Sequence, residues 1–461
     1  MKTLLKLCCA LSLLFVNISC EKTELTDVSS LKSDAETLKT YNNGMIKSYS
    51  NEAIIKWNEL IASYIDEKMP QPAEAKIYVM FTLGMHDALN NVVPKYETYA
   101  LDNASVDASN ISKKNIHAIA DAAVSQAARD IFVTLFPPGT LGADNLLNTL
   151  LSEINDSESK SMGILIGKSA ASAILQKRQN DFPLMFTSFT GTGTDPGDYQ
   201  ANFMPWMLPN PPIWPANAVY APNLGDLTPF GIKSGDQFRD EGTYPINSQE
   251  YIKDYNEVKA LGCTNCPSRT QEQTEIGAFW IENTSSSMNR IARTLIKEDN
   301  LNGWEAARLI ALLEMSQMDA YIASFEGKKY FNFWRPITAV RLGDNDGNPE
   351  TMGDASWTPT YTTPPTPEYP STHSYCGGAG AEILKLYYGT DEKPFTATSP
   401  YTLPGIERPI ANFSQIASEN AVSRIYIGYH FRHAIEVGKR QGKELGAYIF
   451  QNNLRELKKM Q

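Results

Sequence analysis

The stretch Glu368-Tyr369-Pro370-Ser371-Thr372-His373-Ser374 marks the start of a buried helix. A proline-rich run ends at Pro370, and the residues that follow Ser374 are mostly apolar or small. Proline at the boundary and serine at the N-cap position are typical of a helix start. A helix N-terminus presents unpaired backbone N–H groups and the positive end of the helix dipole. The stretch therefore predicts an anion site, with His373 in the first turn of the helix.

Two flanking segments supply positive charge for such a site. Lys328 and Arg335 are seven residues apart, which on a helix places them on one side after two turns. Arg424 and His430 are six residues apart, so they share a ligand only through the reach of arginine or through an irregular turn. Basic side chains, hydroxyl groups and histidines that converge in this way favour a tetrahedral oxyanion.

These residues form three motifs in order along the chain: K-x(6)-R-P, P-S-[GT]-H and S-R-x(5)-H. The pattern is filled by Lys328, Arg335, Pro336, Pro370, Ser371, His373, Ser423, Arg424 and His430. Here the chain resembles the superfamily of type 2 phosphatidic acid phosphatases and vanadium-dependent haloperoxidases. Its proline-rich lead-in is similar to the soluble, bacterial haloperoxidase-like branch. The resemblance covers residues 325–442 and implies an all-α fold of two four-helix bundles.

The resemblance implies an enzyme with vanadate as its cofactor, which oxidises bromide or iodide with hydrogen peroxide. His430 would be the metal ligand, His373 the acid–base catalyst, and Lys328 would polarise the peroxide. The vanadate oxygens would be held by Lys328, Arg335, Ser371, Thr372 and Arg424. Phe325 and Thr366 occupy positions where haloperoxidases shape the halide pocket.

Two alternatives use the same residues. In a soluble exported acid phosphatase, phosphate takes the place of vanadate, His430 attacks phosphorus to form a phosphohistidine, and His373 protonates the leaving oxygen of the phosphate ester. In a non-catalytic lipoprotein, the pocket binds an oxyanion without turnover. Export, chain length and the proline-rich lead-in favour the haloperoxidase.

One position departs from the superfamily pattern. Members carry an aspartate four residues after the last histidine, where this chain has Ala434. Such a carboxylate orients the imidazole and raises its basicity. His433 and Glu436 are the sequence candidates to replace it.

Composition and the N-terminus narrow the setting of the protein. Of 461 residues 42% are hydrophobic, and the net charge of −11 disfavours nucleic acid as a partner. Residues 1–20 read as an export signal that ends at Cys20, with lipidation of Cys20 favoured over plain secretion. We expect a bacterial periplasmic or outer-membrane lipoprotein that meets the membrane only through its lipid and could form a homodimer.

We expect structural roles for the cysteines and for one acidic loop. In an exported protein Cys263 and Cys266 are expected to form a local disulfide, because no further ligand completes a zinc site. Cys376 is expected to pack in the core. The run 344–348 resembles the start of a calcium loop but lacks the closing glutamate, so we interpret it as a turn.

Hydrophobic periodicity divides the chain into five parts: a signal (1–20), a flexible tether (21–50), an N-terminal bundle (51–181), an ordered Pro/Trp-rich loop (182–247) and a catalytic C-terminal bundle (248–461). The pattern predicts N-terminal helices from residue 52 and at 72–92, 112–135 and 143–179, and C-terminal ones at 248–261, 271–284, 287–297 and 303–325. Strand content is expected to be near zero.

A faint internal repeat links the two bundles. Met85-His86-Asp87-Ala88 is similar to Gln317-Met318-Asp319-Ala320, and a lysine follows each. We interpret the halves as products of a duplication, of which only the C-terminal one keeps the oxyanion site. His86 and His117 lie outside the motifs and are expected to have structural roles.

Overall fold

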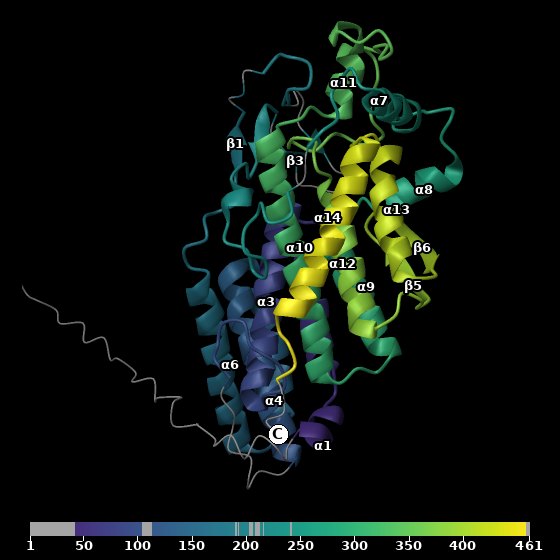
Figure 1. Cartoon of the computed structure of the whole chain (residues 1–461). Coiled ribbons are helices and arrows are strands. Elements are labelled where there is room, and N and C mark those ends of the chain that lie inside the picture. The colour runs from purple at the N-terminus through teal and green to yellow at the C-terminus, as the bar shows by residue number, and fades with distance from the viewer. Residues whose placement is uncertain are drawn as a thin grey trace, which may run out of the picture.

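The computed structural model describes residues 42–103, 113–189, 191, 193–201, 206–207, 213–214, 216–239 and 242–457. Long helices run side by side, as the expected all-α class requires (Figure 1). The helices of the first half are α1 (Asn42–Lys47), α2 (Glu52–Ile65), α3 (Gln71–Val92), α4 (Lys113–Leu135), α5 (Thr140–Ser152) and α6 (Ser157–Lys177). The second half contains α7 (Gln249–Leu261), α8 (Gln271–Phe279), α9 (Thr284–Glu298), α10 (Gly303–Phe331), α11 (Pro336–Leu342), α12 (Thr372–Tyr388), α13 (Phe413–Tyr426) and α14 (Arg432–Asn452).

Short strands and single turns complete the fold. Three antiparallel pairs join β1 (Phe186–Ser188) to β4 (Ala218–Tyr220), β2 (Trp206–Met207) to β3 (Ile213–Trp214), and β5 (Phe395–Ser399) to β6 (Leu403–Ile410). The 3-10 turns are η3 (Pro137–Gly139), η4 (Leu224–Asp226) and η5 (Gly343–Asn345). The expectation of almost no strand was therefore wrong for β5 and β6, where the alternating burial of Phe395, Ala397 and Ser399 is a strand pattern.

Packing joins the two halves into one core. In the first half α4 packs against α3 and α6, and in the second α12 packs against α14, α13 and α10. Helix α10 also packs along α3, so a single apolar cluster extends from Ile46 to Leu454. The predicted boundary near residue 182 therefore does not divide the core.

Several predicted boundaries are corrected by local interactions. The helix expected at 143–179 is two helices, because Asp156 starts α6 by accepting a hydrogen bond from the Ser159 N–H (2.6 Å). The helix expected at 271–284 ends at Phe279 in the structure, and residues 280–283 form a turn before α9.

The predicted tether is also too long at its C-terminal end. Ile46 and Tyr49 are buried, and the Tyr49 hydroxyl donates to Asp121 (2.7 Å). The signal, Cys20 and most of the tether lie outside the described residues.

Two aspartates support the internal repeat. Asp87 accepts hydrogen bonds from the N–H groups of Tyr99, Ala100 and Leu101, at 2.7 to 3.1 Å. Asp319 likewise accepts from Phe230, Gly231 and Ile232, at 2.6 to 2.9 Å. Each repeat helix thus fixes a loop with one buried carboxylate, although the duplication itself stays a prediction.

The cysteines and the acidic loop lie as the sequence predicts. Cys263 and Cys266 form a disulfide, and Cys376 is a buried thiol. Asp346 accepts from the Asn348 N–H and the Thr351 hydroxyl, which closes a turn. Within the described part of the chain, no group of three or more acidic, histidine or cysteine residues is arranged to hold a metal ion.

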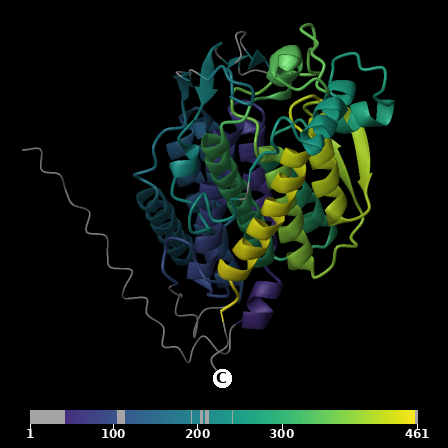
Figure 2. The same ribbon diagram turned by 45° about the horizontal axis from the view of Figure 1, so that its top comes forward.

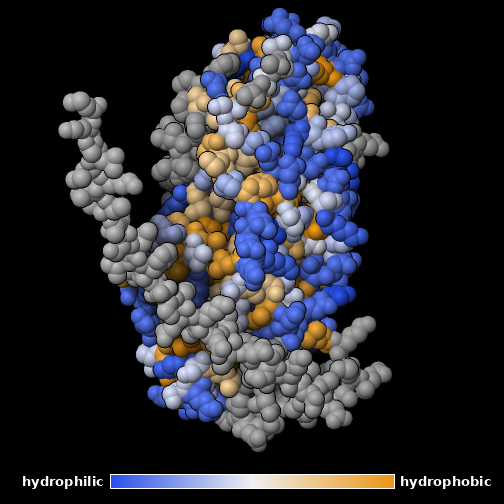
Figure 3. Space-filling model, turned by 90° about the vertical axis from the view of Figure 1, so that its left-hand side faces the viewer, coloured by the Kyte–Doolittle hydropathy of each residue, from blue (hydrophilic) through white to orange (hydrophobic). Residues whose placement is uncertain are grey.

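The surface carries both hydrophilic and hydrophobic side chains. On the face in Figure 3, hydrophilic side chains form long runs and hydrophobic ones show between them. Over the described residues, no helix combines the length and the apolarity that a membrane span needs. At the upper end of the molecule α10 passes into α11, and the loops there come forward in Figure 2.

Candidate active site

The first motif is bent rather than helical throughout. Helix α10 ends at Phe331, Asn332 takes a left-handed conformation (φ 46°), and Arg335 becomes the residue before α11. The prediction that Lys328 and Arg335 share one side of a helix was therefore wrong. They nevertheless line the same cavity, because the chain turns at Asn332.

Lys328 contributes positive charge to the cavity, although its ammonium N–H groups already have acceptors. Its buried ammonium group donates to the carbonyl oxygens of Pro367, Glu368 and Pro370, each at 2.8 Å. Burial, and then the neighbouring Arg335, lower the pKa of Lys328 well below its usual value. An anion in the cavity would offset this and favour the charged form.

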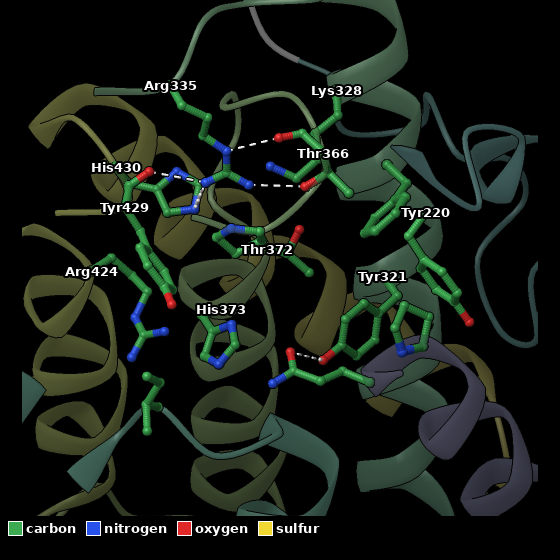
Figure 4. A pocket seen from close by; sticks show the side chains of 15 residues that line it. Tyr220, Tyr321, Lys328, Arg335, Thr366, Thr372, His373, Arg424, Tyr429 and His430 are labelled. Carbon is green, nitrogen blue, oxygen red and sulfur yellow. Dashed lines mark hydrogen bonds between the residues drawn. The ribbon is translucent and has the colours of Figure 1, made fainter. Parts of the chain in front are cut away.

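Arg335 holds the cavity wall together. Its guanidinium donates to the carbonyl oxygens of Thr366 (2.8 Å) and Tyr429 (2.9 Å) and to the Thr366 hydroxyl (2.9 Å). The same group lies 3.0 Å from Nε2 of His430 (Figure 4). Since arginine only donates, Nε2 of His430 must be the accepting, unprotonated nitrogen.

Glu368 fixes the other side of the His430 ring. Its Oε1 lies 2.9 Å from Nδ1 of His430 and accepts from the Phe431 N–H at 3.0 Å. Nδ1 therefore carries the proton, and the Nε2 lone pair points at the cations. Burial raises the pKa of Glu368 to about 7, against the lowering effect of Lys328 and Arg335. Burial, followed by Arg335, lowers the pKa of His430, so the ring is neutral.

This carboxylate is the functional residue that the sequence reasoning missed. Neither sequence candidate replaces the absent aspartate: His433 bonds to the Gly242 carbonyl and stacks on Tyr244, and Glu436 pairs with Arg432 and Lys439 at the surface. The only sequence signal for Glu368 is an acidic residue within an otherwise apolar, proline-rich run.

The third motif contains an irregular turn, which is one of the two ways in which Arg424 and His430 were expected to reach a shared ligand. Helix α13 ends at Tyr426, Gly428 has a φ of 79°, and His430 lies in the turn before α14. Arg424 is buried, donates to the Trp280 carbonyl (2.6 Å) and lines the cavity. Burial lowers the pKa of Arg424 to about 10, so it stays charged. Among the described residues its buried Nη1 has no hydrogen-bond partner.

The α12 N-terminus places the remaining candidates differently. Ser371 caps the helix, and its hydroxyl is engaged by the Ser374 N–H (3.4 Å) and the Ser374 hydroxyl (2.9 Å). It is not among the residues that line the cavity, whereas Thr372 is. The predicted hydroxyl contact to an oxyanion is therefore open to Thr372 and not, in this geometry, to Ser371.

His373 lies at the centre of the cavity (Figure 4). Its Nε2 is 3.1 Å from the Glu282 carbonyl oxygen, which can only accept, so Nε2 carries the proton. Nδ1 is then the nitrogen that can take up a further proton. Burial, and next the charge of Arg424, lower the pKa of His373 well below its usual value, so the ring is a neutral base.

The cavity fits a small tetrahedral oxyanion. Its volume is about 60 Å³, several times the ~10–15 Å³ that a cavity needs to admit one water molecule. Lys328, Arg335 and Arg424 face it together with both histidines. The unpaired Nη1 of Arg424 is a donor that vanadate would satisfy, and Nε2 of His430, which accepts from Arg335 here, is the nitrogen that could bind vanadium instead. Phe325 and Thr366 lie between this cavity and a second one of about 220 Å³ that contains Tyr199 and Phe189.

Comparisons with known proteins reach the part of the chain that holds this site. Residues 308–459 match the family described as the VCPO second helical-bundle domain, and this match includes all three motifs. The chain is also similar to vanadium chloroperoxidase from Curvularia inaequalis, with 30% identity over 292 residues. The match to the fungal enzyme covers 49% of this chain and 47% of that protein, so the chain spans about half the length of this relative.

Solved structures show the same fold over almost the whole chain. A bacterial vanadium-dependent iodoperoxidase aligns with a TM-score of 0.71 at 22% identity and covers 89% of this chain and 99% of its own. An apo-type bacterial vanadium-dependent chloroperoxidase aligns with a TM-score of 0.68 at 17% identity, over 83% of this chain and 94% of its own. The likeness of fold to these two structures therefore includes the N-terminal half, where the family match does not reach.

Proposed function

We propose that the protein is a vanadate-dependent haloperoxidase that oxidises bromide or iodide with hydrogen peroxide. The observation that carries the proposal is the state of His430, a neutral imidazole whose unprotonated Nε2 contacts Arg335 in a cavity that Lys328 and Arg424 also line. Neutral imidazole nitrogen is a common metal ligand, and the other ring nitrogen typically donates to a carboxylate, as here. The relatives named as vanadium chloroperoxidase and iodoperoxidase support the same chemistry.

The residues divide the work by position. His430 would hold vanadium, while Arg335, Arg424, Lys328 and Thr372 would balance and orient the oxygens. Bound vanadate would supply a Lewis acid that activates hydrogen peroxide for transfer of an oxygen atom to halide. His373, neutral and protonated on Nε2, can take a peroxide proton on Nδ1 and return it when water leaves. The fixed cations stabilise negative charge at the reacting oxygens without having to reorganise.

The experiment is vanadate loading of the full-length apo-protein. About one vanadate per chain should bind with phosphate as a competitor, and the loaded protein should oxidise bromide or iodide in the presence of peroxide. Absence of peroxide-dependent halide oxidation in a protein that retains vanadate would refute the proposal.

A phosphatase is the second candidate, because the Glu368–His430 pair equally suits a histidine nucleophile. It would hydrolyse an aryl phosphate without metal, be inhibited by vanadate and form an acid-labile phosphohistidine at His430. If both activities are absent while vanadate still binds, the oxyanion-binding lipoprotein is the better description.

We also propose that the protein is exported and anchored by lipid at Cys20. The apolar segment 7–16 and the cysteine that follows it support this. Metabolic labelling with a fatty acid should mark the unsubstituted protein and not Cys20→Ser.

A further inference from the structure

In one peptide unit beside the cavity, the carbonyl oxygen and the N–H are each hydrogen-bonded to a side chain. The carbonyl oxygen of Glu282 accepts the His373 ring proton at 3.1 Å. The N–H of the same unit, which belongs to Asn283, donates to Oε1 of Glu67 at 2.5 Å. Because a peptide is a planar conjugated group, an anionic acceptor at its N–H polarises its carbonyl as well. Glu67 is therefore linked to His373 through a single peptide.

Glu67 occupies an unusual place for such a residue. It lies in the turn between α2 and α3 of the N-terminal half, is 8% exposed and has a φ of 58°. A left-handed conformation costs a residue other than glycine roughly 1–2 kcal/mol. The turn is held by the Glu67 N–H, which donates to Glu74 (3.2 Å). A buried acid kept in a strained conformation is the kind of feature that clusters at functional sites.

The surroundings of Glu67 make its burial costly. The carboxyl faces Asp66, Glu74 and Glu282. Burial, opposed by the Asn283 N–H and Arg290, raises the pKa of Glu67 to about 8, so the group is ionised only above that pH. A glycine would relieve the backbone strain, and an apolar side chain would avoid the crowding of acids. Neither would present an acceptor to the Asn283 N–H. The contact that only an acidic or amide side chain can make here is the one that leads to His373.

We propose that Glu67 is a positioning residue for His373, acting through the Glu282–Asn283 peptide. When Glu67 is ionised, its carboxylate strengthens the carbonyl as an acceptor, which fixes the Nε2 proton and leaves Nδ1 to receive a proton during turnover. Glu368 does the same for His430 by direct contact. A residue of the N-terminal half thereby completes the site of the other half. The effect on turnover rests on the proposed function, whereas the effect on the ring does not.

The test compares Glu67→Gln with Glu314→Gln in the full-length chain without added vanadate at about pH 9, where both acids are ionised. Glutamine can still accept the Asn283 N–H, so the segment 280–283 is retained and only the charge is removed. Glu314 is an equally buried acid whose partner is Asn289 and which does not line the cavity. The chain has five histidines, so the ring signals can be assigned with His373→Gln as a reference.

Two readouts separate positioning from a merely structural role. In ¹H–¹⁵N spectra of the imidazoles, the His373 Nε2 proton should move upfield in Glu67→Gln and stay in place in Glu314→Gln. After loading with vanadate, kcat should fall about 10-fold in Glu67→Gln with the KM for halide unchanged, as for other groups that orient a catalytic residue indirectly.

An unshifted ring proton together with an unchanged kcat in Glu67→Gln would overturn the inference, and so would equal changes in Glu314→Gln. If the protein oxidises no halide, the ring signal still decides the role of Glu67, so the two proposals fail separately. If Glu67→Gln does not fold, the unsubstituted protein provides the second measurement. Its Asn283 amide and His373 ring protons should titrate with one midpoint, and unrelated midpoints would overturn the inference.

Discussion

In the variant Glu368→Gln, the His430 ring keeps a neighbour of the same size but loses the carboxylate that fixes it. The carboxylate accepts from Nδ1 of His430 (2.9 Å) and from the Phe431 N–H (3.0 Å). A hydrogen bond to a charged group contributes about 1 kcal/mol more than a neutral one. The two bonds together therefore account for about 2 kcal/mol, or about 30-fold in Kd at 1.4 kcal/mol per tenfold.

A second effect acts in the opposite direction. The negative charge of Glu368 offsets part of the positive charge of the cavity, although it also favours the charged forms of Lys328 and Arg335 by raising the pKa of each. Its removal makes the cavity more attractive to any anion. Vanadate depends on the fixed His430 lone pair, whereas free phosphate depends only on charge and hydrogen bonds. The variant should therefore bind vanadate about 30-fold more weakly and phosphate at least as tightly as before.

Calorimetric titration of the apo-protein with each anion measures both effects. Glu436→Gln is the matched control, because this acid was one of the sequence candidates for the same role and pairs with Arg432 and Lys439 at the surface. It should bind both anions as the unsubstituted protein does. If Glu368→Gln bound vanadate and phosphate more weakly by the same factor, the cavity as a whole would have been disrupted. Unchanged vanadate affinity would refute the role of Glu368.

Three further predictions can be tested separately. His430→Ala should lose stable vanadate binding in the same titration, whereas His373→Ala should still bind vanadate but lose on the order of 10²–10⁴-fold in kcat. Normal vanadate binding by His430→Ala would contradict the role of His430 as the ligand. Deletion of residues 1–41 should leave the melting temperature unchanged, but deletion of residues 1–50 should lower it, because loss of the buried Tyr49 side chain alone costs about 3 kcal/mol. Equal melting temperatures of the two deletion variants would support the original prediction of a tether that extends to residue 50. Burial raises the pKa of Glu314 to about 8, so the native state holds a proton that the unfolded chain loses above pH ~4.5, and stability falls as pH rises toward 8. Glu314→Gln should therefore flatten the pH dependence of unfolding, and a steeper fall would contradict this assignment.

The helices and the motif residues could be predicted because their signals are local. Helical periodicity located α2, α3, α4 and α10, and the capping pattern placed the start of α12 within one residue. The irregular turn before His430 was also foreseen as one of two alternatives, because six residues do not fit one face of a helix. These inferences need only neighbours along the chain.

The arrangement of the site could not be predicted in the same way. Lys328 and Arg335 meet because Asn332 turns the chain, and asparagine in a left-handed conformation is one of many outcomes that a sequence allows. Glu368 meets His430 across 62 residues. The segment 280–283 had helical periodicity, yet packing drew it out of α8 so that two of its carbonyls face Arg424 and His373.

The two histidines show why complete motifs are not a complete site. A neutral imidazole works as a ligand or a base only on the nitrogen that lacks a proton, and its partner decides which nitrogen that is. For His430 the partner is Glu368, which the motifs do not specify, and for His373 it is a carbonyl whose own N–H is held by Glu67 in the other half of the chain. In a chain with every motif residue but with leucine at positions 67 and 368, Arg335 and the Glu282 carbonyl would still contact the rings, but His430 would lose the acceptor for its Nδ1 proton and His373 would face a weaker acceptor. We would expect such a chain to bind phosphate and to oxidise halide poorly.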